Sequence, residues 1–177
     1  MFWKKKNKVL KKLQVCSTCG KEHSGLPALG FLEPTNYADL TNQEKSEMAE
    51  CDTDFCIIRH PEQTDRYIRA CLHVPVVDTC DELQYGVWVS LSEKSFESYK
   101  KTYQIDCEKE IYFGRIANWI GCYDDSTIGL HVNVETRNGG IRPELFPHES
   151  EHPLVKDWVS GITYEEALRR VGQRKEL

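Results

Sequence analysis

The chain has 177 residues, of which 40% are hydrophobic and 29% charged, a composition typical of a globular protein rather than a disordered one. Its net charge of −5 is uneven, because six lysines lie within residues 4–12, before the first acidic residue, Glu22, and the rest of the chain has 17 basic against 28 acidic residues. A body this acidic is a poor general binder of nucleic acid, because phosphate binding needs a basic face. No apolar run follows the lysines, so we predict neither an export signal nor a membrane span, and we expect a cytoplasmic protein. We predict a lysine-rich extension over residues 1–14 and a single domain over residues 15–177.

The segment after the lysines contains Cys16 and Cys19, two cysteines separated by two residues and followed by glycine. Such a turn presents both sulfurs to one metal ion, and His23 is near enough in sequence to be a third ligand. A fourth ligand would come from a distant part of the fold, with these candidates: Cys51, Cys56 and His152. We therefore expect a structural Zn²⁺ site in an N-terminal Cys-x-x-Cys knuckle. The alternative is that the pair consists of two reduced thiols in a turn.

A helix and two strands are predicted next. Residues 41–44 form a capping box, which predicts a short helix ending near Cys51. Residues 55–59 and 66–74 have the composition of strands, joined by a connection that fits a hairpin. Alternate residues of the second strand share a face, and one face is plainly apolar. The apolar, core face comprises Ile68, Ala70, Leu72 and Val74. The other face comprises Tyr67, Arg69, Cys71 and His73.

The second half of the chain contains further strands and helices. Residues 85–90 are a predicted strand, and residues 90–93 are the capping box of a helix with a core-facing aromatic stripe: Phe96, Tyr99 and Tyr103. Further strands are expected at residues 111–116, 130–136 and 141–146, with a hairpin turn at residues 137–140. A last helix begins at Thr163. This pattern predicts an α+β fold with an antiparallel sheet and a few short helices.

Four residues are candidates for a binding surface: Tyr67, Arg69, His73 and Trp88. The first three share the non-core face of their strand and could line a pocket, although such faces are more often solvated or covered by a helix. Trp88 alternates with two valines and so faces away from them, where it could anchor a partner. Packing beneath a helix is the more common use of a tryptophan at such a position, and we favour it for Trp88.

Residues 148–152, His-Glu-Ser-Glu-His, match the histidine spacing of zinc metalloproteases. That chemistry needs both histidines on one helical turn, so that both rings reach the same ion. Pro153 disfavours a helical conformation at His152, and we interpret the match as a coincidence.

Several segments match one family pattern in order: residues 16–23, 25–27, 54–56, 67–69, 74–75, 85–93 with Phe96, 141–143, 152–154 and 161–163. The most specific is Gly-Val-Trp-Val-Ser-Leu-Ser-Glu, within residues 85–93. The chain thereby resembles the bacterial family domain of unknown function 2199, over nearly its whole length. The resemblance implies a small intracellular bacterial protein and no established activity. It departs from the pattern at Cys122, where similar sequences more often have proline before the tyrosine.

Three hypotheses about function follow. The first, which we favour, is a non-enzymatic binding or regulatory protein whose acidic surface captures a basic protein partner, such as one half of a toxin–immunity pair. The second is a zinc-dependent hydrolase that uses some of these residues: Cys16, Cys19, His23 and His152. The third is a nucleic-acid-associated protein with the lysine-rich start as its arm, although the acidic body makes nucleic acid the less suitable partner.

Overall fold

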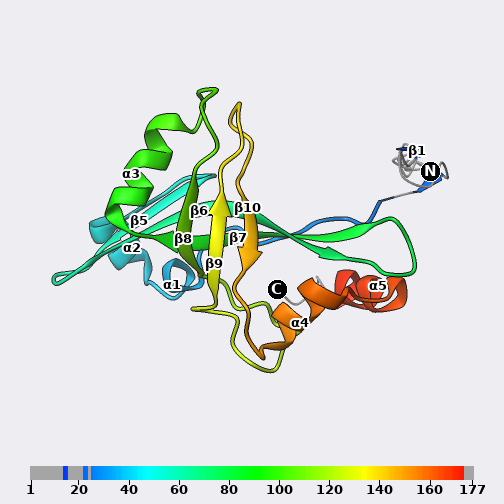
Figure 1. Ribbon diagram of the computed structural model, residues 1–177. Helices are drawn as coiled ribbons and strands as arrows, with labels where there is room; N and C mark the ends of the chain where they lie inside the picture. Colours follow the sequence, from blue (N-terminus) through cyan, green and yellow to red (C-terminus); the bar gives the residue numbers. More distant parts are fainter. Residues whose placement is uncertain (1–13, 16–21, 24, 174–177) are drawn as a thin grey trace, which may run out of the picture.

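A computed structural model describes residues 14–15, 22–23 and 25–173 (Figure 1). Its strands are β1 (Gln14–Val15), β2 (Glu22–His23), β3 (Leu29–Gly30), β4 (Ala49–Cys51), β5 (Phe55–Arg59), β6 (Thr64–Pro75), β7 (Glu82–Leu91), β8 (Ile111–Ile116), β9 (His131–Glu135) and β10 (Glu144–Pro147). Its helices are α1 (Thr35–Ala38), α2 (Asn42–Met48), α3 (Glu93–Thr102), α4 (Pro153–Ser160) and α5 (Tyr164–Gly172). Within these residues, no helix has the length and apolarity needed to cross a bilayer.

Strands β6 to β10 form a closed barrel. Each strand from β6 to β10 pairs antiparallel with the next, and β10 then returns beside β6 in parallel, through Glu144 and Cys71. Strand β5 pairs antiparallel with residues 64–68 of β6, and β4 pairs with β5, which extends the sheet beyond the barrel. Strand β3 pairs in parallel with β7. The predicted combination of helices with a sheet is therefore confirmed. The prediction of a purely antiparallel sheet was incomplete, because the two parallel pairings join segments far apart in sequence.

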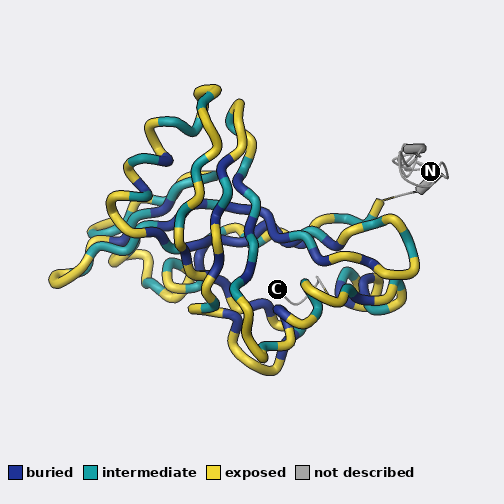
Figure 2. Tube along the Cα trace, viewed as in Figure 1, coloured by how far each residue is buried: buried dark blue, intermediate teal, exposed yellow. Residues whose placement is uncertain are grey.

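The main core fills the barrel and continues beneath the helices. The predicted core face of β6 is confirmed, since Ile68, Ala70, Leu72 and Val74 are all fully buried. They pack in one cluster with residues of α3, α4 and α5: Phe96, Tyr99, Leu154 and Ala167. Figure 2 shows the buried positions concentrated on the barrel strands and the exposed ones on the loops.

A second buried cluster lies on the opposite side of β6. It comprises Cys56, Ile58, Tyr67, Trp88 and Ala117. Partly buried residues of α1 and α2, including Tyr37 and Met48, cover it. The face of β6 that contains Tyr67 is therefore also packed over part of its length, as expected where helices cover both faces of a sheet.

Local sequence signals located most elements correctly. The strand predicted at residues 111–116 is β8, and Thr41 forms the complete capping box of α2. That helix ends at Met48, however, because the chain turns into β4, where Cys51 pairs with Cys56.

The N-cap of α3 and the helix α4 differ from the sequence prediction. Ser90 remains in β7 between Tyr67 and Arg115, so Ser92 is the N-cap of α3 in its place. The pattern-based assignment missed α4, an eight-residue helix that begins at Pro153.

The predicted N-terminal knuckle lies mostly outside the described residues. Cys16 and Cys19 are not among them, and only the backbone of His23 is described. Strands β1 and β2 pair antiparallel, which places Gln14 opposite His23 and Val15 opposite Glu22.

Candidate functional site

The loop between β8 and β9, residues 117–130, is held by buried side chains at its base. Asn118 accepts a hydrogen bond from the Trp88 backbone N–H (2.7 Å) and donates one to the Glu33 carbonyl (2.9 Å). Thr127 donates from Oγ1 to the Asn118 carbonyl (2.7 Å) and accepts from the Ile120 N–H (2.8 Å). Because both side chains are buried and satisfied, the loop has a fixed conformation rather than a free one.

This loop exposes large apolar side chains. Trp119 is 54% exposed and Ile128 is 40% exposed, and the hydrogen bonds of Thr127 hold the two ends of the loop together. The neighbouring segment adds Leu32, which is 86% exposed. Thr35 ties that segment to the loop, since its N–H donates to the Ala117 carbonyl (3.0 Å) and its Oγ1 accepts from the Trp119 N–H (3.2 Å). An exposed tryptophan on a fixed loop is a candidate anchor for a partner.

The same loop is acidic. Asp124 and Asp125, in the middle of the loop sequence, are exposed. We call Leu32, Trp119, Asp124, Asp125 and Ile128 the Trp119 surface.

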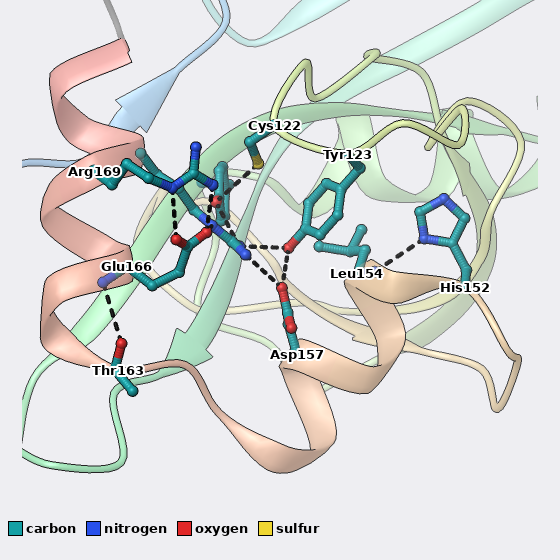
Figure 3. Close-up of polar contacts among 10 residues, drawn as sticks. Cys122, Tyr123, His152, Leu154, Asp157, Thr163, Glu166 and Arg169 are labelled. Carbon is teal, nitrogen blue, oxygen red and sulfur yellow. Dashed lines mark hydrogen bonds and ion pairs between the residues drawn. The ribbon is translucent and has the colours of Figure 1, made fainter.

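A buried arginine, Arg170, joins this loop to the two C-terminal helices, and Figure 3 labels its partners Tyr123, Asp157 and Glu166. Arg170 of α5 is only 7% exposed. Its Nη1 donates to the Tyr123 hydroxyl (2.7 Å) and the Tyr85 hydroxyl (3.4 Å), and its Nη2 donates to Asp157 of α4 (2.7 Å). Its Nε donates to Glu166 (2.6 Å). Tyr123 belongs to the loop and donates in turn to Asp157 (2.8 Å), so one network joins the loop to α4, α5 and β7.

The network fixes the charge of its members. Burial alone disfavours the charged form of Arg170, but Tyr123, Tyr85 and Asp157 outweigh it and raise the pKa of the guanidinium. Hydrogen bonds from Arg169 and Arg170 lower the pKa of Glu166 to about 2, against the opposing effect of burial. Burial, followed by the nearby Tyr85, raises the pKa of Tyr123. Arg170 and Glu166 are thus an ion pair at neutral pH.

The chain between α4 and α5 sets the position of Arg170. Gly161 adopts a φ of 76°, and an added Cβ would lie 2.4 Å from a methyl carbon of Val77 and 3.0 Å from the Pro75 carbonyl oxygen. Because the two backbones approach this closely, the Ile162 N–H donates to the Pro75 carbonyl (2.8 Å) and the Val77 N–H donates to the Ile162 carbonyl (2.9 Å). Thr163 then caps α5, accepting from the Glu166 N–H (3.2 Å).

A cavity of about 170 Å³ borders the network. Its lining consists of Leu29, Tyr85, Ile120, Gly121, Cys122, Arg170 and Gln173. Pockets for small-molecule ligands usually measure about 300–1,000 Å³, so this cavity is small for a substrate. Burial raises the pKa of the Cys122 thiol, which keeps it protonated and weakly nucleophilic.

Three of the residues singled out from the sequence come together in the second buried cluster. Cys56 and Tyr67 are cross-strand partners, and Trp88 packs with them at zero exposure. The Trp88 indole N–H donates to the Phe31 carbonyl (3.3 Å). In this structure neither Tyr67 nor Trp88 presents a side chain to a partner, because α1 and α2 cover them.

Arg69 and His73 are half-buried on the same face of β6. Burial, followed by the nearby Arg142, lowers the pKa of Arg69, although Asp54 acts in the opposite direction. His73 Nδ1 contacts Glu144 of β10, and burial lowers the pKa of the imidazole. His73 thus helps to join the two parallel strands that close the barrel. A binding role for either residue stays a prediction.

His152 is the N-cap of α4, where its Nδ1 accepts from the Leu154 N–H (3.0 Å). Its backbone is extended, so the expectation that residues 148–152 do not form a metalloprotease helix is confirmed. The structure does not bring His152 and Cys56 into a common site. Among the described residues, no group of three or more His, Cys, Asp or Glu side chains could hold a metal ion.

Sequence reasoning missed both Trp119 and Arg170. Trp119 lies between two strands in Ala-Asn-Trp-Ile-Gly, and a tryptophan outside any periodic apolar pattern was the available signal. Arg170 follows Glu166 by four residues, which reads as an ordinary helix-surface ion pair. Only the fold reveals that this pair is covered by the loop.

The protein therefore has an α+β fold in which the acidic β8–β9 loop of a five-stranded barrel is hydrogen-bonded to the C-terminal helices. A sequence profile of the family described as uncharacterized protein conserved in bacteria, domain of unknown function 2199, matches residues 15–162. The chain belongs to this family, as its resemblance predicted. The match ends before α5, so Glu166 and Arg170 lie outside it. No curated protein and no solved structure matches the chain significantly.

Proposed function

We propose that this protein is a non-enzymatic binding domain that captures a basic protein partner through the Trp119 surface. The observation that carries the proposal is the exposure of Trp119 on a loop immobilised by the Arg170 network. Tryptophan is among the residues that dominate binding energy at protein interfaces. A preformed loop also loses little conformational entropy on binding, which preserves affinity.

The charge of the protein supports a basic partner. Residues 25–173 contain 26 acidic and 14 basic side chains. Asp124 and Asp125 add two negative charges to the loop that carries Trp119. Complementary charge accelerates the encounter of partners and favours a basic surface over an acidic one. A cytoplasmic toxin–immunity pair is one setting in which such a capture domain would act.

A zinc-dependent hydrolase is the less favoured alternative. His152 would have to supply a ligand, but its Nδ1 already caps α4 and its Nε2 is buried. A catalytic zinc needs a coordination position open to water. A histidine buried in this way is poorly placed to provide such a site.

A structural zinc ion at Cys16, Cys19 and His23 remains part of the proposal. The pairing of β1 with β2 supports it, since the two strands bring the ends of residues 16–21 together. The ion would stabilise the N-terminal segment and take no part in the capture of the partner.

Affinity capture from an extract of the source bacterium tests the binding proposal. The baits are the wild type, Trp119→Ala, Asp124→Lys with Asp125→Lys, and the control Val159→Ala. Val159 is a good control because it is 70% exposed on α4, outside the Trp119 surface. We expect the wild type and the control to enrich the same basic protein, Trp119→Ala to lose it, and the charge reversal to weaken its capture. Equal capture by the wild type and Trp119→Ala would contradict the proposal.

A truncated variant distinguishes the nucleic-acid hypothesis from the binding proposal. Deletion of residues 1–12 removes all six early lysines. If these lysines form a nucleic-acid arm, the deletion abolishes salt-sensitive binding to DNA or RNA. Partner capture through Trp119 is expected to survive the deletion.

A further inference from the structure

Cys51 and Cys56 face each other across the hairpin of β4 and β5. The turn between them is well defined, because Asp52 Oδ1 accepts from the N–H groups of Asp54 (2.8 Å) and Phe55 (2.7 Å). The Asp52 N–H also donates to the Phe55 carbonyl (2.8 Å), so these two residues are a hydrogen-bonded pair. The next pair, Cys51 and Cys56, is then a non-hydrogen-bonded pair, in which antiparallel strands bring side chains closest together.

This spacing suits a disulfide. In non-hydrogen-bonded pairs the Cα atoms lie about 4.5 Å apart, and disulfides span Cα separations of about 4.4–6.8 Å. Both residues are free thiols and direct cross-strand partners in the register of β4 and β5. Bridging them therefore requires little movement of the backbone.

The two thiols differ in reactivity. Cys56 is fully buried within the second cluster, whereas Cys51 is half-buried. Cys51 borders a surface hollow of about 350 Å³ that small molecules can enter. Cys51 is thus the thiol that an oxidant can reach, and Cys56 is the buried thiol opposite it.

We infer that Cys51 and Cys56 form a thiol-modification site, at which a hydroperoxide oxidises Cys51 and Cys56 resolves the product as an intramolecular disulfide. The Cys51 thiolate attacks one oxygen of hydrogen peroxide. The O–O bond breaks, Cys51 becomes a sulfenic acid, and the other oxygen leaves as hydroxide and takes a proton to become water. Cys56 then loses its proton and attacks the Cys51 sulfur, the S–O bond breaks, and a second water leaves. Two thiols and one peroxide yield one disulfide and two waters. This inference is independent of the proposed binding function.

Peptide mapping after brief treatment with hydrogen peroxide tests the site. Both cysteines lie in a single tryptic peptide, residues 46–59, because the nearest cleavage sites are Lys45 and Arg59. We expect this peptide to lose the mass of two hydrogen atoms, to resist alkylation, and to recover both thiols after reduction. The measurement uses the full-length wild-type protein, so it does not depend on any variant that fails to fold.

Variants assign the roles of the two sulfurs. Cys56→Ser should leave a sulfenic acid on Cys51 that dimedone traps, and Cys51→Ser should leave the peptide unoxidised under the same treatment. Cys107→Ser, a substitution at a half-buried cysteine elsewhere, should oxidise as the wild type does. A peptide 46–59 that keeps both thiols while other cysteines react would overturn the inference. So would a disulfide that joins Cys51 to any cysteine other than Cys56.

Discussion

Replacement of Arg170 by methionine tests whether the buried network clamps the loop. Methionine keeps most of the apolar stem and removes the guanidinium that donates to Asp157, Glu166 and Tyr123. Tyr123 still donates to Asp157, and Arg169 still donates to Glu166. Breaking a buried ion pair from one side costs about 3–5 kcal/mol, because the remaining charge stays buried and unpaired. The Asp157 and Glu166 side chains are 25% and 28% exposed, so water partly solvates them after the change. We therefore expect a loss near the lower end of that range, about 3 kcal/mol.

Urea unfolding followed by tryptophan fluorescence measures this loss. With a slope of about 2 kcal/mol per molar urea, the midpoint should fall by about 1.5 M. The melting temperature should fall by about 6–12 °C, the range for a chain of this size. Hydrogen exchange should also accelerate in residues 117–130, since Tyr123 loses its link to α5.

Arg169→Met is the matched control. Arg169 also donates to Glu166, but its side chain is 51% exposed. An ion pair of such an exposed side chain contributes little to stability, so the control should change little. The clamp would be refuted if both variants lost the same stability, or if Arg170→Met unfolded within about 0.5 kcal/mol of the wild type.

Three further changes have defined outcomes. Because the pKa of Glu166 falls to about 2 in the folded state, its contribution is present above its ordinary pKa of 4.5 and is lost as the pH falls towards 2. Urea titrations should show the wild type losing about 1 kcal/mol more than Glu166→Gln between pH 6 and pH 2, an amount reduced by solvent screening; equal losses would contradict this. Gly161→Ala should destabilise the protein by about 2 kcal/mol in thermal unfolding, because of the positive φ at this position and the close contact with Pro75. Gly172→Ala is the control: an added Cβ meets nothing there, so this variant should be neutral or slightly stabilising. Elemental analysis of the purified protein should find one zinc per chain, lost together with stability in the double variant Cys16→Ser, Cys19→Ser; a wild type without zinc would exclude the knuckle.

The sequence was most informative where local rules determine local structure. Alternation along β6 identified its core face, and the capping box at Thr41 located the start of α2. Such signals depend only on the neighbouring residues, which explains their success. The closure of the barrel was not predictable in this way, because the parallel pairing of β6 with β10 joins residues about 70 positions apart through one register pair, Cys71 and Glu144.

The candidate site depends on burial that no local pattern encodes. Trp88 and Trp119 look alike in the sequence, and only Trp88, in a strand, was considered as a binding residue, with packing beneath a helix as the favoured interpretation. The fold buries Trp88 beneath α1 and α2, whereas the β8–β9 loop exposes Trp119. Arg170 likewise has the spacing of a surface ion pair, and it is buried because Tyr123 and Asp157 approach from other elements.

Site-specific photo-crosslinking in the living source bacterium tests the central claim most directly. A photoreactive phenylalanine analogue replaces Trp119 in one strain and Val159 in another, and both strains are irradiated under the same conditions. If the Trp119 surface captures the partner, we expect a covalent adduct with one basic protein at position 119 and none with that protein at position 159. Adducts of that protein at position 159 alone, or no adduct at position 119, would contradict capture through the β8–β9 loop.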